Sequence, residues 1–208
     1  EFRKSVADLQ AKGMKKLIVD LQGNPGGYMG AAIYMADELL GGRDLIVSQS
    51  GKVTQYSNKA YASKPGMFEE GSVIVLINEG SASASEILAG AIQDNDRGLI
   101  VGRRSFGKGL VQMPIDLSDG AELRLTIARY FTPSGRSIQK PYDEGYEAYE
   151  RDELNRFEQG EYFSADSIKF NDSLKYQTKK GRTVYGGGGI MPDYFVPLDT
   201  TMNSAYVN

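Results

Sequence analysis

The sequence contains no histidine and no cysteine among its 208 residues. These absences exclude the Ser-His-Asp triad, a cysteine nucleophile and most zinc sites, because each needs one of the missing side chains. Nucleophilic catalysis by this chain would therefore use a hydroxyl group, with a lysine, a carboxylate or water as the base. The absence of cysteine is compatible with any compartment and does not define a redox environment.

Long apolar runs and a strong charge imbalance are also missing. No stretch approaches the roughly 18 apolar residues of a membrane span, and the first residues show no signal-peptide pattern. The net charge of −3 gives no electrostatic reason to expect binding to nucleic acid or to an anionic membrane. The chain begins at Glu1, within a predicted helix, so we expect it to be a piece of a longer protein.

The residues that are present predict an α/β fold. Hydrophobic residues make up 40% of the chain, which is enough for a core without disulfides or metal. Short apolar strands alternate with amphipathic helices, and this order is typical of a core with parallel strand pairing. Strands are expected at 17–19, 72–77, 99–101, 110–111 and 121–131, a hairpin at 45–47 and 52–56, and helices at 1–12, from after 27 to 40, and at about 84–93.

From Lys140 to about Arg182 the composition changes, with few aliphatic residues, several tyrosines and dense charge. We interpret residues 140–182 as an insertion or lid-like lobe on the core, followed by a return to the core at 183–208. A solvated surface lobe is the favoured interpretation, and a substrate lid or a dimer contact are the alternatives.

Ser83 lies in the small-residue segment Gly80-Ser81-Ala82-Ser83-Ala84-Ser85-Glu86, directly after the apolar strand 72–77. This order places Ser83 at the carboxyl edge of the sheet and at the start of a helix. Free backbone N–H groups and the helix dipole favour developing negative charge there. The alternative is that Ser83 only caps the helix, with Glu86 completing a capping box.

Lys108 lies between two glycines in Phe106-Gly107-Lys108-Gly109. An unperturbed lysine has a pKa of about 10.4, so only about one molecule in a few thousand is neutral at pH 7. A lysine base therefore needs desolvation, and the apolar strand after this turn suits an inward-pointing side chain. Gln112, four residues later, would share a face with Lys108 in an extended segment and orient its amine. The alternative is an exposed lysine in a glycine turn.

The loop Gly23-Asn24-Pro25-Gly26-Gly27 lies between a strand and a helix. Its backbone N–H groups suit an oxyanion hole. It lacks the glycine patterns of dinucleotide-binding and P-loop sites, so a nucleotide is not expected. An ordinary turn is the alternative interpretation. Together, Ser83, Lys108 and this loop indicate a Ser-Lys hydrolase.

These segments resemble the catalytic domain of the C-terminal processing peptidases, also called tail-specific proteases. The matching stretches are 17–27, 78–91, 93–94, 101–112, 130–139 and 189–193. The distance of 25 residues from Ser83 to Lys108 also fits that family. The resemblance covers most of residues 1–139 and the end of the chain.

The resemblance implies a role for each matching position. Ser83 would be the nucleophile, Lys108 the general base and Gln112 the residue that orients the lysine, and the backbone N–H groups of Gly27 and Ala84 would form the oxyanion hole. Asp94 matches an acidic position implicated in some members, and we interpret it as structural support. The implied fold is an α/β spiral of the Clp-peptidase and crotonase type.

The resemblance also implies what the protein does as a whole. It implies a serine endopeptidase that cleaves protein or peptide substrates near their C-termini through an acyl-enzyme, with no metal, nucleotide or other cofactor. Residues 1–139 would form the catalytic core, and the PDZ domain that usually precedes it is expected to be absent from this chain. Members are mostly exported, periplasmic or envelope-associated. The substrate, the oligomeric state and any activating partner are left open.

Two other classes of function are alternatives. One is a non-catalytic ligand- or peptide-binding relative of the same fold, which would not need both Ser83 and Lys108. The other is a crotonase-like acyl-CoA enzyme that uses the 24–27 loop and the Ser83 loop as amide donors. No basic cluster suited to the CoA phosphates stands out near those loops.

Overall fold

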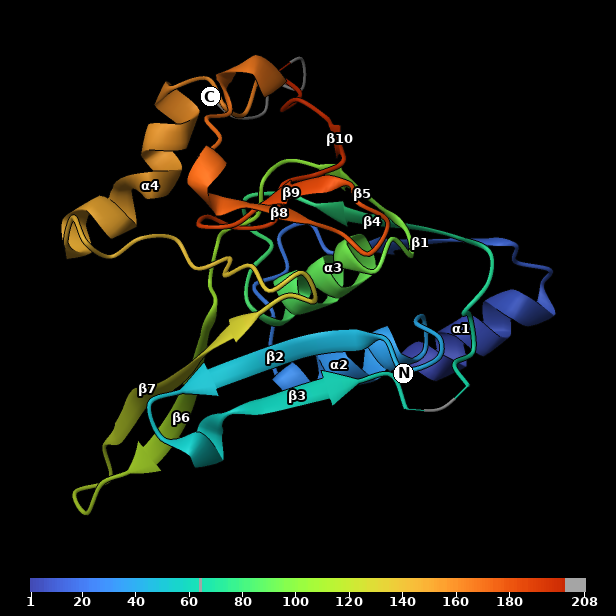
Figure 1. Ribbon diagram of the computed structural model, residues 1–208, viewed down its shortest axis with the longest axis horizontal. Helices are drawn as coiled ribbons and strands as arrows, with labels where there is room; N and C mark the ends of the chain where they lie inside the picture. Colours follow the sequence, from blue (N-terminus) through green and yellow to red (C-terminus); the bar gives the residue numbers. More distant parts are fainter. Residues whose placement is uncertain (64, 201–208) are drawn as a thin grey trace, which may run out of the picture.

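A parallel sheet forms one layer of the molecule (Figure 1). The structure, a computed structural model, describes residues 1–63 and 65–200. The strand order is β1 (Lys16–Asp20), β4 (Ser72–Ile77), β5 (Leu99–Gly102) and β10 (Tyr194–Phe195), and all neighbours pair in parallel. β4 is the apolar sequence Ser-Val-Ile-Val-Leu-Ile, whose β-branched residues favour a half-buried strand. The predicted α/β class with parallel pairing is confirmed.

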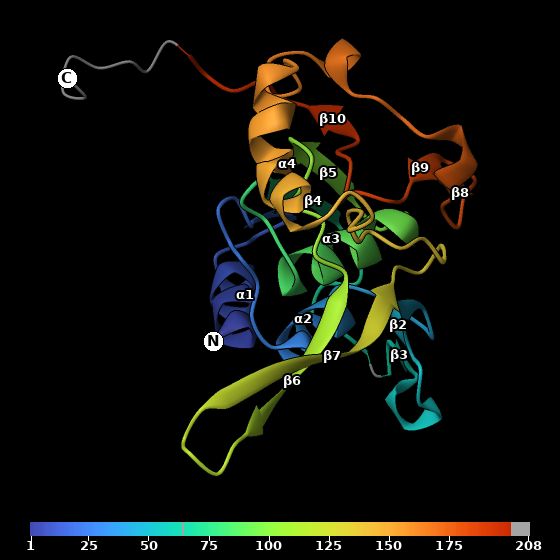
Figure 2. The same cartoon turned by 90° about the vertical axis from the view of Figure 1, so that its left-hand side faces the viewer.

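A second, antiparallel sheet lies across the molecule from the first. Its order is β3 (Asn58–Tyr61), β2 (Leu45–Gly51), β7 (Glu122–Phe131) and β6 (Leu110–Asp116). β6 and β7 form a long hairpin whose tip projects from the body of the molecule (Figures 1 and 2). A short 3₁₀ turn, Thr54–Tyr56, lies between β2 and β3.

Helix α3 (Ala84–Asp94) lies at the centre of the molecule, and all eleven of its residues are buried. It contacts α2 (Met29–Asp37), β2 and β5, so elements from both sheets surround it (Figure 1). The small side chains of its alanines, and Gly90, allow neighbouring elements to pack closely around the helix, while Ile87, Leu88 and Ile92 fill the core. α1 (Phe2–Ala11) packs at the side through Val6.

The region from 140 onward contains a helix that the sequence did not predict. α4 (Tyr146–Glu158) is followed by two 3₁₀ turns, Ala165–Ser167 and Asp172–Leu174, and by the hairpin of β8 (Lys175–Gln177) and β9 (Thr183–Tyr185). The polar composition of α4 hides its periodicity, because its buried side chain is that of Arg156. The chain then returns to the core as β10; residues 201–208 of the predicted return lie outside the described residues.

Several predicted elements differ from the structure. The partner of β2 is β3 at 58–61, because residues 54–56 form a 3₁₀ turn. α2 was expected to continue to residue 40 but ends at Asp37. Leu39 and Leu40 are buried beyond its end, so their apolar character did not mark the end of the helix. In β1 only alternate residues are buried, and Ile18 is 62% exposed, so this strand covers the core with one face.

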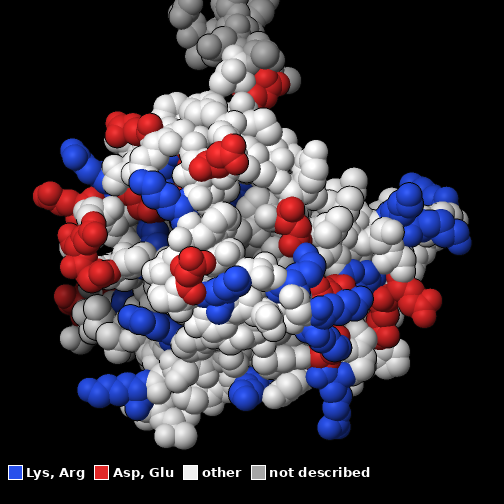
Figure 3. All heavy atoms as spheres, turned by 45° about the horizontal axis from the view of Figure 1, so that its top comes forward, with Lys and Arg blue, Asp and Glu red and all other residues white. Residues whose placement is uncertain are grey.

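Charged side chains of both signs are interspersed over the face shown in Figure 3. Within residues 1–63 and 65–200, none of the helices combines the length and the apolar character that crossing a membrane requires.

Candidate active site

Ser83 lies where the chain passes from β4 into α3, and its backbone is strained. Its φ of 55° and ψ of −115° belong to a region that residues other than glycine rarely adopt. Such a conformation costs on the order of 1–3 kcal/mol and persists only where the surroundings hold it. Here the Ser83 N–H donates to Glu86 Oε2 at 2.8 Å, and the preceding Ala82 N–H donates to the Asn24 carbonyl at 3.0 Å.

The 21–27 loop is hydrogen-bonded along the Ser83 turn. The buried Ser81 hydroxyl donates to the Leu21 carbonyl at 2.7 Å, and the Ser85 hydroxyl donates to the Asn24 carbonyl at 3.0 Å. These bonds place the glycine-rich loop directly beside the start of α3. The backbone groups predicted for the oxyanion hole, those of Gly27 and Ala84, therefore belong to two loops that are bonded to each other.

Gly26 makes the closest approach between these loops. A Cβ atom at this position would lie 2.5 Å from the Ala82 carbonyl oxygen and 2.7 Å from the Ala84 nitrogen. Its φ of +94° also favours glycine. Only glycine allows the loop to approach Ser83 this closely, so the glycine at position 26 has a steric reason.

Lys108 lies in the connection from β5 to β6, which has no regular structure of its own. The Gly107 and Lys108 N–H groups donate to the Glu86 carboxylate at 2.7 and 2.8 Å. The Gly109 N–H donates to Gln139 Oε1 at 2.8 Å. Side chains from other elements thus hold the backbone on both sides of the lysine.

Glu86 joins the two predicted catalytic loops, a role that the sequence analysis missed. Its carboxylate, 1% exposed, accepts from the N–H groups of Ser83, Gly107 and Lys108 and from the Ser105 hydroxyl. Burial raises the pKa of Glu86, and the Ser105 hydroxyl and the backbone donors act against that rise. The capping box of Ser83 and Glu86 that the sequence suggested is present, and the same carboxylate is also an acceptor shared with a loop more than 20 residues away.

Tyr130 forms a second connection between the same loops. Its hydroxyl, on β7, lies 3.0 Å from the Ser83 carbonyl oxygen and 2.6 Å from the Lys108 carbonyl oxygen. Burial raises the pKa of Tyr130 well above its ordinary value, and the Glu86 charge adds to this effect. The hydroxyl therefore stays protonated and can donate to these carbonyls. The sequence showed Tyr130 only as part of a matching stretch.

The structure brings all five predicted site residues to one cavity of about 470 Å³. Ser83 and Lys108 are partly exposed in it, which leaves both side chains accessible. Gln112 lies on β6 beyond a β-bulge between Val111 and Gln112, so it does not simply alternate with Lys108 along a regular strand. The cavity is lined by Gly27, Tyr28, Met29, Ser83, Ala84, Ile87, Lys108, Leu110, Val111, Gln112, Pro114, Glu122, Arg124 and Tyr130.

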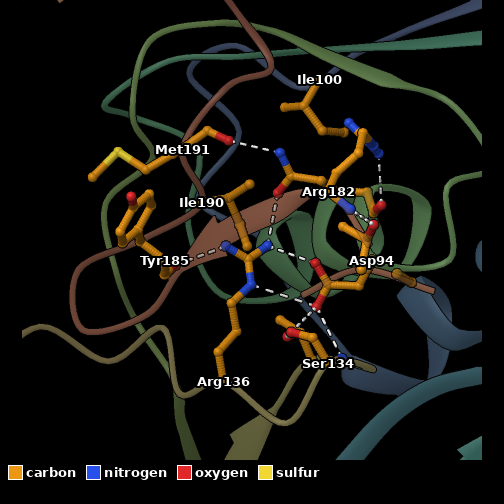
Figure 4. Close-up of polar contacts among 12 residues, drawn as sticks. Asp94, Ile100, Ser134, Arg136, Arg182, Tyr185, Ile190 and Met191 are labelled. Atoms are coloured by element: carbon orange, nitrogen blue, oxygen red, sulfur yellow. Dashed lines mark hydrogen bonds and ion pairs between the residues drawn. The ribbon is translucent and has the colours of Figure 1, made fainter. Parts of the chain in front are cut away.

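Asp94 is the last residue of α3, at the opposite end of the helix from Ser83, and it does not line this cavity. It forms a fully buried ion pair with Arg136 at 2.8 Å and accepts from the Ser134 hydroxyl at 2.6 Å (Figure 4). Arg136 also donates to Gln93 and to the Tyr185 carbonyl. This position fits the predicted structural role of Asp94.

No cluster of three or more potential metal-ligating acidic side chains occurs within residues 1–63 and 65–200.

Comparison with known proteins points to proteases. The sequence profile of peptidase family S41 matches residues 1–146. A carboxy-terminal-processing protease from Bartonella bacilliformis is 41% identical over 165 residues, covering 72% of this chain and 38% of that protein. A chloroplastic C-terminal processing peptidase from Tetradesmus obliquus is 39% identical, covering 66% of this chain and 29% of that protein.

A solved structure has the same core. The photosystem II D1 C-terminal processing protease superimposes with a TM-score of 0.58 at 39% identity, covering 65% of this chain and 35% of that one. This confirms the predicted α/β core of the Clp-peptidase type. The chain spans about a third of the length of these relatives. Because the profile covers well over half of its residues, the chain belongs to peptidase family S41, the family of carboxyl-terminal-processing serine proteases.

Proposed function

We propose that this chain is the catalytic core of a serine endopeptidase that uses Ser83 as its nucleophile and Lys108 as its general base. The observation that carries the proposal is that both residues line one cavity together with Gly27, Ala84 and Gln112. In a chain without histidine or cysteine, this pair combines a nucleophilic hydroxyl with a group able to accept its proton.

The mechanism follows from these positions. The Lys108 amine takes the proton from the Ser83 hydroxyl, whose oxygen attacks the scissile carbonyl to form a tetrahedral intermediate. The Gly27 and Ala84 N–H groups stabilise its oxyanion, and one such donor typically contributes about 3 kcal/mol. The lysine then returns the proton to the leaving amine, which leaves an acyl-enzyme on Ser83. Water activated by the same lysine hydrolyses this ester.

Supporting groups hold these residues in place. Glu86 and Tyr130 contact the backbone of both loops, and this pre-organisation reduces the rearrangement needed during attack. Gln112 orients the lysine amine from β6. No metal or nucleotide takes part in the proposed reaction.

The substrates proposed for this site are unfolded proteins or peptides, cut near their C-termini, as the names of the relatives suggest. The location proposed for the protein is exported or envelope-associated. The PDZ domain stays a prediction for the longer protein, and the oligomeric state and any activating partner stay open.

The test is cleavage of an unfolded protein by the longest natural polypeptide that contains this chain. Ser83→Ala and Lys108→Ala are expected to abolish cleavage while the fold is retained. Lys108→Arg should be as inactive as Lys108→Ala, because arginine does not release its proton at neutral pH. Gln112→Ala should reduce turnover less severely.

Two results would contradict the proposal. Substantial cleavage by purified Ser83→Ala protein would exclude this serine as the nucleophile, and near-normal turnover by Lys108→Arg would exclude this lysine as the base. Absence of cleavage by the wild-type protein would favour the non-catalytic binding class.

A further inference from the structure

The 140–182 lobe contacts the segment that leads to Lys108. Arg156, on α4, is 4% exposed and points its guanidinium group into the core. It donates to the Arg104 carbonyl at 2.7 Å and to the Ser105 carbonyl at 3.2 Å. These carbonyls belong to the irregular connection from β5 to β6, where no strand partner satisfies them.

A shared carboxylate fixes the orientation of Arg156. Glu161 accepts from Arg156 Nε at 3.1 Å. It also accepts two hydrogen bonds from the Arg104 guanidinium group, at 2.6 and 2.7 Å. All three side chains are largely buried. The planar guanidinium groups use several donors at once, which a lysine ammonium cannot reproduce in the same geometry.

Lys140 provides a second contact from the lobe to the same segment. Its ammonium nitrogen lies 4.1 Å from the ring centroids of both Phe106 and Tyr149 and donates to the Tyr149 carbonyl at 2.9 Å. Phe106 precedes Gly107 and Lys108, whereas Tyr149 belongs to α4. The cation therefore links α4 to the residue two positions before the proposed base.

The two sides of this segment are held by different parts of the chain. On the inner side Glu86 accepts from Ser105, Gly107 and Lys108; on the outer side Arg156 donates to residues 104 and 105. The family match ends at residue 146, the first residue of α4, so Arg156 lies outside it.

We propose that Arg156 is a positioning residue, through which the α4 lobe holds the 104–108 segment and so places Lys108 against Ser83. This inference rests on the proposed function and deepens it. It assigns the lobe a part in turnover, in place of the surface role that its composition favoured. Arg156 touches no reacting atom; it acts through two backbone carbonyls.

The experiment compares Arg156→Ala and Arg156→Lys with the same changes at Arg151, an exposed arginine of α4. The full natural polypeptide cleaves a quenched fluorescent peptide below the unfolding midpoint of every variant. Arg156→Ala should lower kcat by about 10- to 100-fold, because small displacements of a catalytic group carry penalties of that order. KM should change less than about twofold, since bound substrate does not contact Arg156.

Arg156→Lys should recover part of kcat, because an ammonium group can still donate to one of the two carbonyls. If Arg156→Ala does not fold, the comparison of Arg156→Lys with Arg151→Lys decides the question. Equal kcat in the Arg156 and Arg151 variants would overturn the inference, as would a loss confined to KM.

Hydrogen exchange gives a readout that does not need activity. The Gly107 and Lys108 amides should exchange faster in Arg156→Ala than in Arg151→Ala, and equal rates would overturn the inference. Cleavage that survives Ser83→Ala in the same assay would instead refute the proposed function, while the exchange data would still decide whether Arg156 holds the segment.

Discussion

At the scale of single residues, Glu86 concentrates the largest number of constraints on the candidate site. A carboxylate can accept at both oxygens, and here each oxygen takes two donors: Ser105 and Gly107 at one, Ser83 and Lys108 at the other. An amide of the same shape has one acceptor oxygen and one NH₂ group, which only donates. The site therefore requires the negative charge of the Glu86 carboxylate as well as its shape.

Glu86→Gln should therefore damage both stability and activity. Two of the four donors would face an NH₂ group, and each unsatisfied buried donor costs about 1–3 kcal/mol. We expect turnover to fall by about tenfold or more, because the Ser83 and Lys108 loops lose their common acceptor. Urea unfolding and peptide cleavage measure the two effects, with exposed Glu70→Gln as the control. A glutamine variant with normal turnover would show that the shared carboxylate is dispensable.

The raised pKa of Glu86 predicts a pH dependence of stability. Between the ordinary pKa of a glutamate and the raised value in the folded state, the folded protein binds a proton that the unfolded chain has lost. The Glu86 contribution to the free energy of unfolding therefore increases as the pH falls through this window. Urea unfolding at a series of pH values should show the difference between wild type and Glu86→Gln widening toward acid. A constant difference would mean that the pKa is not raised.

At the scale of elements, the site depends on the close packing of the 21–27 loop against the turn at Ser83. A substitution at Gly26 tests this packing. Gly26→Ala should push the 21–27 loop away from Ser83, because its methyl group would overlap the Ala82 carbonyl. We expect activity to fall by about 100-fold.

Gly23→Ala is the matched control for this change. Gly23 also has a positive φ, +65°, but open space surrounds its added Cβ. Both variants should lose roughly 1–2 kcal/mol of stability through the left-handed backbone. Only Gly26→Ala should lose activity beyond what that destabilisation explains; equal activities would refute the steric argument.

Short-range patterns predicted most elements, whereas the roles of the candidate site residues came from the family resemblance and stay predictions. The strand at 72–77 and the helix after Ser83 have clear apolar periodicity and an obvious start, so their bounds agree closely with the structure. α4 was missed because its contact with the core is made by Arg156, and a buried arginine looks like a surface residue in a sequence pattern. The role of Glu86 was missed because its partners at 105–108 are distant in the chain.

At the scale of the whole molecule, a buried polar network joins α3 to three later segments (Figure 4). Arg136 connects Asp94 with the Tyr185 carbonyl, and Gln93 donates to the Met191 carbonyl at 2.8 Å. Arg182 also pairs with Asp193, whose carboxylate accepts from the Ile100 N–H. The C-terminal return is therefore tied to α3, the helix that directly follows Ser83.

Asp94→Asn should destabilise the protein by roughly 3–5 kcal/mol, because it leaves the charge of Arg136 buried without its partner. The free energy of unfolding in urea measures this loss, with exposed Asp143→Asn as the control. A loss of less than about 1 kcal/mol, the scale of a surface ion pair, would show that water reaches the pair.

The strained backbone at Ser83 has a consequence for how this protein can evolve. A glycine would adopt its φ of 55° without penalty, so Ser83→Gly should unfold at a higher temperature than Ser83→Ala. Any drift toward greater stability at this position would thus remove the hydroxyl on which the proposed chemistry depends. At this single residue, selection for turnover and selection for stability act in opposite directions. An inactive but more stable homologue would therefore arise by a change at this position.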